Sequence, residues 1–322
     1  MPFIRMALAA GLVATGLSTA ALAQTYPSEP IKLVVPFPPG GTSDFVGRVV
    51  SETLGKQLGQ PVIVENRPGA AGTIGTVGVS QAAPDGYTIL LTSSDITITP
   101  IIQANAPFDP IKDFAPIGLV LRYSHYLVAN AAFPAKTVGD LITLAKAKPG
   151  TINFASGGIG GSNHMAAERF QSVAGIKLTH VPYKGNGPAI TDLVANRVQL
   201  LWTSLPPVQA FISSGKLKII GITSKERSPA TPDVPTFSES GLPGYELNNW
   251  FGVLAPPKTP PAIVERLNAA LKETMASPEV LKKLEALGMD PVVNQPAEFS
   301  AMLKDEMESW RLIAKQAGLA AK

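Results

Sequence analysis

The chain has 322 residues, with 27 basic and 24 acidic side chains and no cysteine. The formal net charge of +3 at pH 7 is small, and the Lys and Arg residues are scattered, which argues against nucleic acid as a partner. The absence of cysteine excludes disulfides, thiol nucleophiles and thiolate metal sites, so the fold must be stabilised by packing.

Residues 1–23 have the layout of a secretory signal peptide. Arg5 is their only charged side chain, an apolar run follows over residues 6–17, and Ala21-Leu22-Ala23 forms a small-x-small cleavage site. We therefore predict a periplasmic protein that is cleaved after Ala23 and is long enough for two domains of roughly 150 residues. An uncleaved membrane anchor is the alternative, but the run is short for a span and two glycines interrupt it.

A loop rich in proline and glycine joins the first two predicted elements. Residues 31–35 form an apolar run typical of a buried strand, and residues 44–58 have the apolar spacing of an amphipathic helix. The loop carries three prolines, which stiffen it, and then Gly40 and Gly41, which permit close backbone approach. Polar residues suited to a helix start follow, so free N–H groups would face the loop. Such a place suits a carboxylate, although a plain strand–turn–helix connection fits the same residues.

Strand-like and helix-like segments alternate along the chain. Strands are predicted at residues 31–35, 61–65, 87–92, 151–155, 176–181, 198–202, 217–223 and 249–254, and helices at 44–58, 137–147, 162–174, 187–196, 261–276, 278–287 and 296–317. This α/β alternation predicts mostly parallel sheets covered by helices. We expect a first block over residues 24–125, a second over 126–225, and a crossover with a helical return to the first block over 226–322.

A second glycine-rich loop repeats the pattern of the first. Ser156 ends a predicted strand, four glycines occur in the next five residues, and Ser162 stands where a helix would start. Two such loops, one in each block, would face each other across a cleft. Ser162 and His164 could suggest a nucleophile and a base, but residues two apart at a helix start do not face each other, and the final glycine of a nucleophile elbow is missing. A helix cap or a ligand hydrogen bond is the better interpretation of Ser162.

Other motifs of catalysis or cofactor binding are not found in the sequence. The glycines at 69, 72, 75 and 78 recur at spacing three and lack the pattern of a dinucleotide loop, and no phosphate-binding loop is present. The three histidines lack the i, i+4 spacing of a zinc site, and no acid–base pair stands out. We therefore predict no cofactor, no metal and no catalytic residue.

Several segments resemble one family along essentially the whole mature chain, in order. They are Val35-Pro36-Phe37-x-Pro39-Gly40-Gly41-x-x-Asp44, Glu65-Asn66-Arg67-Pro68-Gly69-Ala70-Ala71-Gly72, Pro84-Asp85-Gly86-Tyr87-Thr88, Val181-Pro182-Tyr183-Lys184-Gly185, Gly215-Lys216-Leu217-Lys218, Pro232-Asp233-Val234-Pro235-Thr236 and Trp250-Phe251-Gly252. These segments are similar to the Bug-type extracytoplasmic solute-binding receptors of tripartite tricarboxylate transporters. The resemblance implies a type II periplasmic binding protein fold, with two doubly wound α/β lobes, a hinge and an interlobe cleft.

The resemblance also implies a function and a site. The receptor would capture a small carboxylate in the cleft and deliver it to membrane permease subunits, and we expect a monomer. Backbone amides around the first loop would hold one carboxylate, Asp44 would order that loop, and residues of both lobes would complete the pocket. The ligand-binding residues expected in this way are Phe37, Pro39, Gly40, Gly41, Thr42, Asp44, Ser93, Ser94, Ser156, Gly161, Ser162, His164 and Thr203.

One residue departs from the family pattern. The family often carries Phe-Asp at the end of the strand where this chain has Trp202-Thr203. Without that acid, a ligand ammonium would lack a local counter-charge unless Asp192 or another acid reaches it, so we expect a preference for carboxylates that have no amino group. The alternative is that Thr203 faces the core and has no bearing on the ligand.

Two other classes of function fit parts of the same sequence. One is a periplasmic hydrolase acting on a carboxylated substrate, and the other is a receptor that signals its bound state to a membrane kinase. Turnover assays would separate the hydrolase from a receptor, and capture of membrane partners by the liganded protein would separate signalling from transport.

Overall fold

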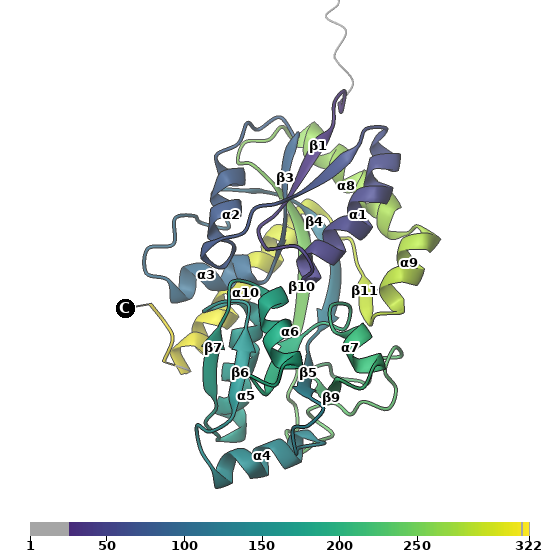
Figure 1. Ribbon diagram of the computed structural model, residues 1–322. Coiled ribbons are helices and arrows are strands. Elements are labelled where there is room, and N and C mark those ends of the chain that lie inside the picture. The colour runs from purple at the N-terminus through teal and green to yellow at the C-terminus, as the bar shows by residue number, and fades with distance from the viewer. Residues whose placement is uncertain (1–25, 317, 322) are drawn as a thin grey trace, which may run out of the picture.

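A computed structural model describes residues 26–316 and 318–321. The predicted signal peptide and its cleavage site lie outside these residues. Two β-sheets, each covered by helices, form an upper and a lower lobe, and strands β4, β5 and β10 run between them (Figure 1). This is the two-lobed type II architecture that the resemblance implied.

The first lobe contains a six-stranded sheet with the order β11-β4-β10-β3-β1-β2. Its strands are β1 (Ile31–Val35), β2 (Val62–Asn66), β3 (Thr88–Ser93), β4 (Ala115–Ser124), β10 (Asn248–Ala255) and β11 (Met289–Pro291). The helices that precede or follow them are α1 (Thr42–Leu58), a short 3₁₀ turn (Ala70–Gly72), α2 (Thr73–Ser80), α3 (Asp95–Ile102), α8 (Pro261–Met275), α9 (Pro278–Glu285) and α10 (Pro296–Gln316).

The second lobe contains a five-stranded sheet with the order β7-β6-β8-β5-β9. Its strands are β5 (Tyr126–Asn130), β6 (Asn153–Ser156), β7 (Thr179–Pro182), β8 (Leu200–Thr203) and β9 (Leu217–Ile222). Its helices are α4 (Val138–Ala147), α5 (Ser162–Ala174), α6 (Asn186–Val194) and α7 (Gln209–Ser213). A capping box fixes the start of α4, because the Thr137 hydroxyl accepts from the Asp140 amide and the Asp140 carboxylate accepts from the Thr137 amide.

The sheets are mixed, and the prediction of mostly parallel sheets was wrong in this respect. In each lobe three strands pair in parallel, whereas β10 and β11 in the first sheet and β5 and β9 in the second pair antiparallel with their neighbours. The physical reason is the path between the lobes. Strand β4 continues into β5 through His125 alone, so the chain enters the second sheet directly, without the crossover helix that a parallel strand requires.

The second passage between the lobes joins β9 to β10 through residues 223–247. The two passages lie side by side, because the Thr223 amide donates to the His125 carbonyl at 2.9 Å and β10 then pairs with β4, starting with Asn248 opposite Ser124. The lobe boundaries that we expect at residues 125 and 225 remain predictions. They are meant as the limits of folding units, and the path of the chain does not test such limits.

Helix α10 packs on both lobes. Phe299 and Leu303, near its start, lie in the apolar core of the first lobe, with Trp250 and Leu254. Trp310 and Ala314, further along, lie in a core cluster of the second lobe, which also receives Ile98 and Ile101 from α3. The long C-terminal helix thus spans the junction between the lobes (Figure 1). Within the described residues, no helix is both long enough and apolar enough to cross a bilayer.

Candidate functional site

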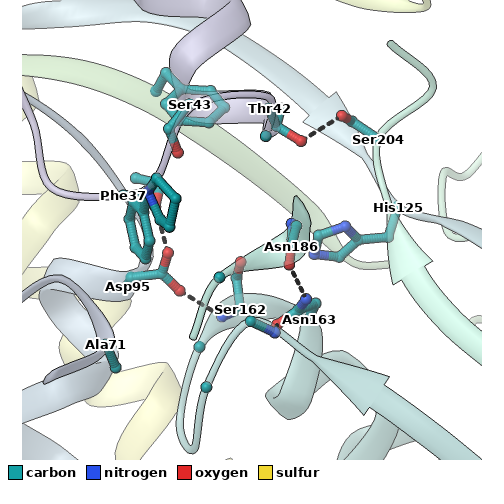
Figure 2. A pocket seen from close by; sticks show the side chains of 18 of the residues that line it. Phe37, Thr42, Ser43, Ala71, Asp95, His125, Ser162, Asn163, Asn186 and Ser204 are labelled. Atoms are coloured by element: carbon teal, nitrogen blue, oxygen red, sulfur yellow. Dashed lines mark hydrogen bonds between the residues drawn. The ribbon is translucent and has the colours of Figure 1, made fainter. Parts of the chain in front are cut away.

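A cleft between the lobes is lined by both glycine-rich loops (Figure 2). The residues that line it are Phe37, Pro38, Gly41, Thr42, Ser43, Ala71, Ser93, Asp95, Tyr123 and Phe251 from the first lobe, His125 from the passage between lobes, and Gly157, Gly158, Gly161, Ser162, Asn163, Gly185, Asn186 and Ser204 from the second lobe. The lobes touch across it, because the hydroxyls of Thr42 and Ser204 lie 2.7 Å apart and the Ser162 amide donates to Asp95 at 2.5 Å.

The first loop presents the start of α1 to the cleft. Gly41 occupies the N-cap position in an extended conformation, and no side chain caps this end. Among the described residues, the amides of Thr42 and Ser43 donate no hydrogen bond, and both residues line the cleft. These amides and the positive end of the helix dipole therefore offer an anion site.

Asp44 orders this loop from behind. Its carboxylate accepts from the Gly40 amide at 3.0 Å, from the Asn66 side-chain amide at 3.1 Å and from the Arg48 guanidinium at 3.0–3.1 Å. Burial alone would raise the pKa of Asp44, but the hydrogen bonds from Arg48, Gly40 and Asn66 outweigh it and hold the pKa below its usual value. The carboxylate is thus ionised at neutral pH and fixes the loop, while Gly40 adopts a left-handed φ of 85°.

The second loop differs from the first at the corresponding amide. Gly161 is the N-cap residue of α5, so Ser162 is the first helical residue and its hydroxyl is not the cap. The Ser162 amide is already bound by Asp95 of the opposite lobe. The Gly160 amide donates to His164 Nδ1 at 3.0 Å, which holds the loop from within the second lobe.

Asp95 is a cleft residue that the sequence analysis missed. Its second carboxylate oxygen accepts from the Ser93 hydroxyl at 2.7 Å, and its side chain points toward Ser162 in Figure 2. Burial raises the pKa of Asp95, although the hydrogen bonds from Ser93 and Ser162 oppose the shift. The feature of the sequence that could have identified Asp95 as a site residue is its position directly after Ser93 and Ser94, at the cleft end of a strand.

The predicted site residues divide into those that reach the cleft and those that do not. The structure brings together Phe37, Gly41, Thr42, Ser93, Gly161 and Ser162 on its walls. The others lie behind them or elsewhere: Pro39, Gly40, Asp44, Ser94, Ser156, His164 and Thr203. Sequence reasoning did not select Ala71, Asp95, Tyr123, His125, Asn163, Asn186, Ser204 or Phe251, which come together only through the fold.

Two of the predicted residues are enclosed by their own lobe. Ser94 donates from its hydroxyl to Asn249 at 2.9 Å, which ties β3 to β10. Thr203 is 1% exposed, and its hydroxyl has no hydrogen-bond partner within the described part of the chain. The next residue, Ser204, is the one that reaches the cleft.

Ser156 and His164 belong to a cluster beneath the second loop. The Ser156 hydroxyl lies 2.6 Å from His180 Nε2 and also contacts the backbone of Gly158, and the rings of His164 and His180 stack at 3.9 Å. Burial, with the neighbouring His164, lowers the pKa of His180 to about 4. Ser156 is fully buried and away from the cleft wall, so this serine–histidine contact supports the loop and does not present a nucleophile.

His125 is the residue at the first passage between the lobes. It is 2% exposed, burial lowers its pKa to about 3, and neither ring nitrogen has a hydrogen-bond partner in the described residues. Its ring points toward Asn186 in the cleft (Figure 2). A neutral imidazole of this kind can donate one hydrogen bond and accept another. No cluster of His, Asp and Glu able to hold a metal ion occurs in the part of the chain that the structure describes.

Comparisons with known proteins identify the family. Residues 46–319 match the tripartite tricarboxylate transporter family receptor. The chain belongs to this family. It is 36% identical over 309 residues to protein BugT of Bordetella pertussis (strain Tohama I), which covers 95% of each chain.

Solved structures agree with this assignment. The periplasmic binding protein BugD is 35% identical, with a TM-score of 0.88 over 92% of this chain and 100% of that one. The structure of R. palustris Rpa4515 with adipate is 32% identical, with a TM-score of 0.89 over 92% of this chain and 99% of the other. The resemblance seen in the sequence is thereby confirmed, and the protein is a solute-binding receptor of the tripartite transporter type.

Proposed function

We propose that the cleft captures a small carboxylate and that the closed receptor delivers it to the permease subunits of a tripartite transporter. The observation that carries this proposal is the start of α1, where the amides of Thr42 and Ser43 face the cleft without a protein partner among the described residues. A ligand carboxylate would satisfy both amides and interact favourably with the helix dipole. The adipate-bound relative supports a carboxylate as the class of ligand.

The proposal includes the setting in which the receptor works. We infer export, cleavage after Ala23 and action as a monomer in the periplasm, supported by the signal-peptide pattern and by the family. Intact mass of the protein recovered from the periplasm tests the processing. A mass that still includes residues 1–23 would contradict it.

A thermal-shift panel tests carboxylate binding. Mono-, di- and tricarboxylates should give at least one clear rise in melting temperature, because a ligand at a hundredfold excess over its Kd stabilises the protein by about 2.7 kcal/mol. Asp44→Asn should weaken the binding of that ligand, since the substitution loosens the Gly40–Asp44 hydrogen bond that orders the loop. Titration calorimetry on the best ligand then gives the stoichiometry.

The hydrolase remains the candidate from another class, and the same preparation tests it. Within the described residues the cleft presents no hydroxyl that is hydrogen-bonded to a histidine, since neither ring nitrogen of His125 has a partner and the Ser156–His180 contact lies beneath the loop. A panel in which no carboxylate raises the melting temperature while a carboxylate ester is steadily hydrolysed would favour the enzyme. Capture of a membrane kinase by the liganded protein would instead favour a sensory receptor.

A further inference from the structure

The two helix starts that face the cleft are not equivalent. At α1 the first amides have no protein partner among the described residues, whereas at α5 the Ser162 amide is taken by a carboxylate oxygen of Asp95, 67 residues away in the other lobe. The second anion site of the cleft is therefore partly occupied by the protein itself, since of its first two amides only that of Asn163 has no partner within the described residues. A ligand carboxylate at this end would have to displace Asp95 and would then lie beside it.

The surroundings of Asp95 make a second carboxylate unfavourable. No Lys or Arg is present among the residues that line the cleft in the described structure. The ionisable groups that interact with Asp95 are Tyr123 and Glu306, and neither can carry a positive charge. His125, which also lines the cleft, is neutral because burial lowers its pKa. Two carboxylates in such a place repel each other in an environment that screens charge poorly.

The acceptor capacity of Asp95 is only partly used. Each carboxylate oxygen accepts one bond, from Ser162 at 2.5 Å and from Ser93 at 2.7 Å, and an ionised carboxylate can accept about four in all. Asp95 also keeps partial exposure, since it borders the cleft. A group that donates hydrogen bonds and carries positive charge would complete its coordination and remove the cost of enclosing the charge.

We propose that Asp95 binds an ammonium group, so that the ligand is a small zwitterion with its carboxylate at α1 and its amino group at Asp95. The proposal rests on the proposed function, because the carboxylate end is held at Thr42 and Ser43. It replaces the expectation drawn from Thr203, since Asp95 supplies the acid that Thr203 lacks and Thr203 does not reach the cleft wall. Asp95 is then the residue that determines which end groups are accepted.

Matched ligand pairs test the proposal on the unmodified protein. Each pair exchanges the distal carboxylate for an ammonium at similar length: succinate with β-alanine, glutarate with 4-aminobutyrate, and adipate with 5-aminovalerate. Calorimetric titration should show the amino member of at least one pair binding about tenfold to a hundredfold more tightly, the range expected for a charge-assisted hydrogen bond. Tighter binding of the dicarboxylate in every pair that binds would overturn the role of Asp95 and leave carboxylate binding intact.

Two variants separate the role of Asp95 from a general effect on the cleft. Asp95→Ser should abolish the preference for the amino member and improve dicarboxylate binding, because it frees the Ser162 amide. Asp44→Asn is the control, since it should weaken both members of a pair equally and leave their ratio unchanged. If Asp95→Ser keeps the ratio of the unmodified protein, the proposal is wrong. Absence of binding by all six ligands would refute the inference, and the proposed function would fall with it only if no carboxylate of the thermal-shift panel raises the melting temperature.

Discussion

Closure of the cleft depends on a glycine that faces a proline ring across it. Gly185 stands before α6 in the second lobe with φ of 103°, and a Cβ added there would lie 2.7 Å from Cδ and 2.8 Å from Cγ of Pro38 in the first loop. The Pro38 ring is rigid and lies in the loop that presents the carboxylate site. Gly185→Ala therefore adds a methyl group to the interlobe contact as well as a strained backbone.

The two costs of Gly185→Ala can be separated. An alanine at this φ costs about 1–3 kcal/mol in the open and closed forms alike, so it lowers stability and leaves affinity unchanged. Crowding against Pro38 occurs only when the lobes meet and costs about 1–3 kcal/mol, comparable to overpacking in a core. Ligand affinity should therefore fall about 5- to 150-fold, at 1.4 kcal/mol for each factor of ten.

A matched variant distinguishes strain from obstruction. Gly241 has nearly the same φ, 101°, in the passage between β9 and β10, and an added Cβ meets nothing within 4 Å. Gly241→Ala should lose stability in thermal unfolding but keep the affinity of the unmodified protein in calorimetric titration. Adding Pro38→Ala to Gly185→Ala should restore part of the affinity. Unchanged affinity in Gly185→Ala, or an equal loss in Gly241→Ala, would refute this account of closure.

Three further substitutions test other contacts. Ser204→Ala removes the hydrogen bond to Thr42 across the cleft, so affinity measured by calorimetry should fall by about 0.5–1.5 kcal/mol while unliganded stability changes little. Ser162→Ala should weaken binding by a similar amount without loss of unliganded stability, because Gly161 is the cap of α5; an equal loss of stability would show a structural role. Burial raises the pKa of Glu306 to about 7, although the hydrogen bond from Trp250 opposes the shift. The folded state therefore holds this proton more tightly than the unfolded state, and stability should fall as pH rises from about 4.5 to 7, by on the order of 1–2 kcal/mol because the residue is only partly exposed. Denaturant unfolding at several pH values should show this slope reduced in Glu306→Gln, and an unchanged slope would contradict the assignment.

The elements that the sequence predicted are those with a strong local pattern. Helix α5 was predicted at residues 162–174 and the strand β1 at 31–35, with the bounds that the structure has. In both, the apolar pattern agrees with the tertiary packing, and breakers mark the ends: prolines flank β1 and glycines flank α5. Local and global preferences therefore point to the same element.

The elements that the sequence missed have conflicting local patterns. Strand β4 contains Pro116 and Gly118, which read as breakers, yet it is held on both sides by β10 and β11. Helix α3 is rich in β-branched residues and contains Pro100, a composition that favours a strand or a turn. Packing of its isoleucines into the core of the second lobe overrides that preference, and no local pattern reports such a contact.

The same distinction explains the site. The two glycine loops could be recognised because each is a continuous segment, and half of the predicted residues on them reach the cleft. Asp95 starts the missed helix α3, and its partner Ser162 lies in the other lobe. Its importance therefore appears only when the lobes are brought together.

The closed cleft contains both satisfied and unsatisfied polar groups, and the difference indicates what the ligand must supply. Thr42 pairs with Ser204, and Asn163 donates to Asn186 at 2.8 Å, so removing these groups from water costs little free energy. The amides at the start of α1 and both ring nitrogens of His125 have no partner within the described residues. Each buried polar group left without a hydrogen bond costs about 1–3 kcal/mol, so closure of the cleft without a ligand is unfavourable. A ligand that bonds to these groups removes the penalty only in the closed form, and this differential interaction shifts the population toward closure.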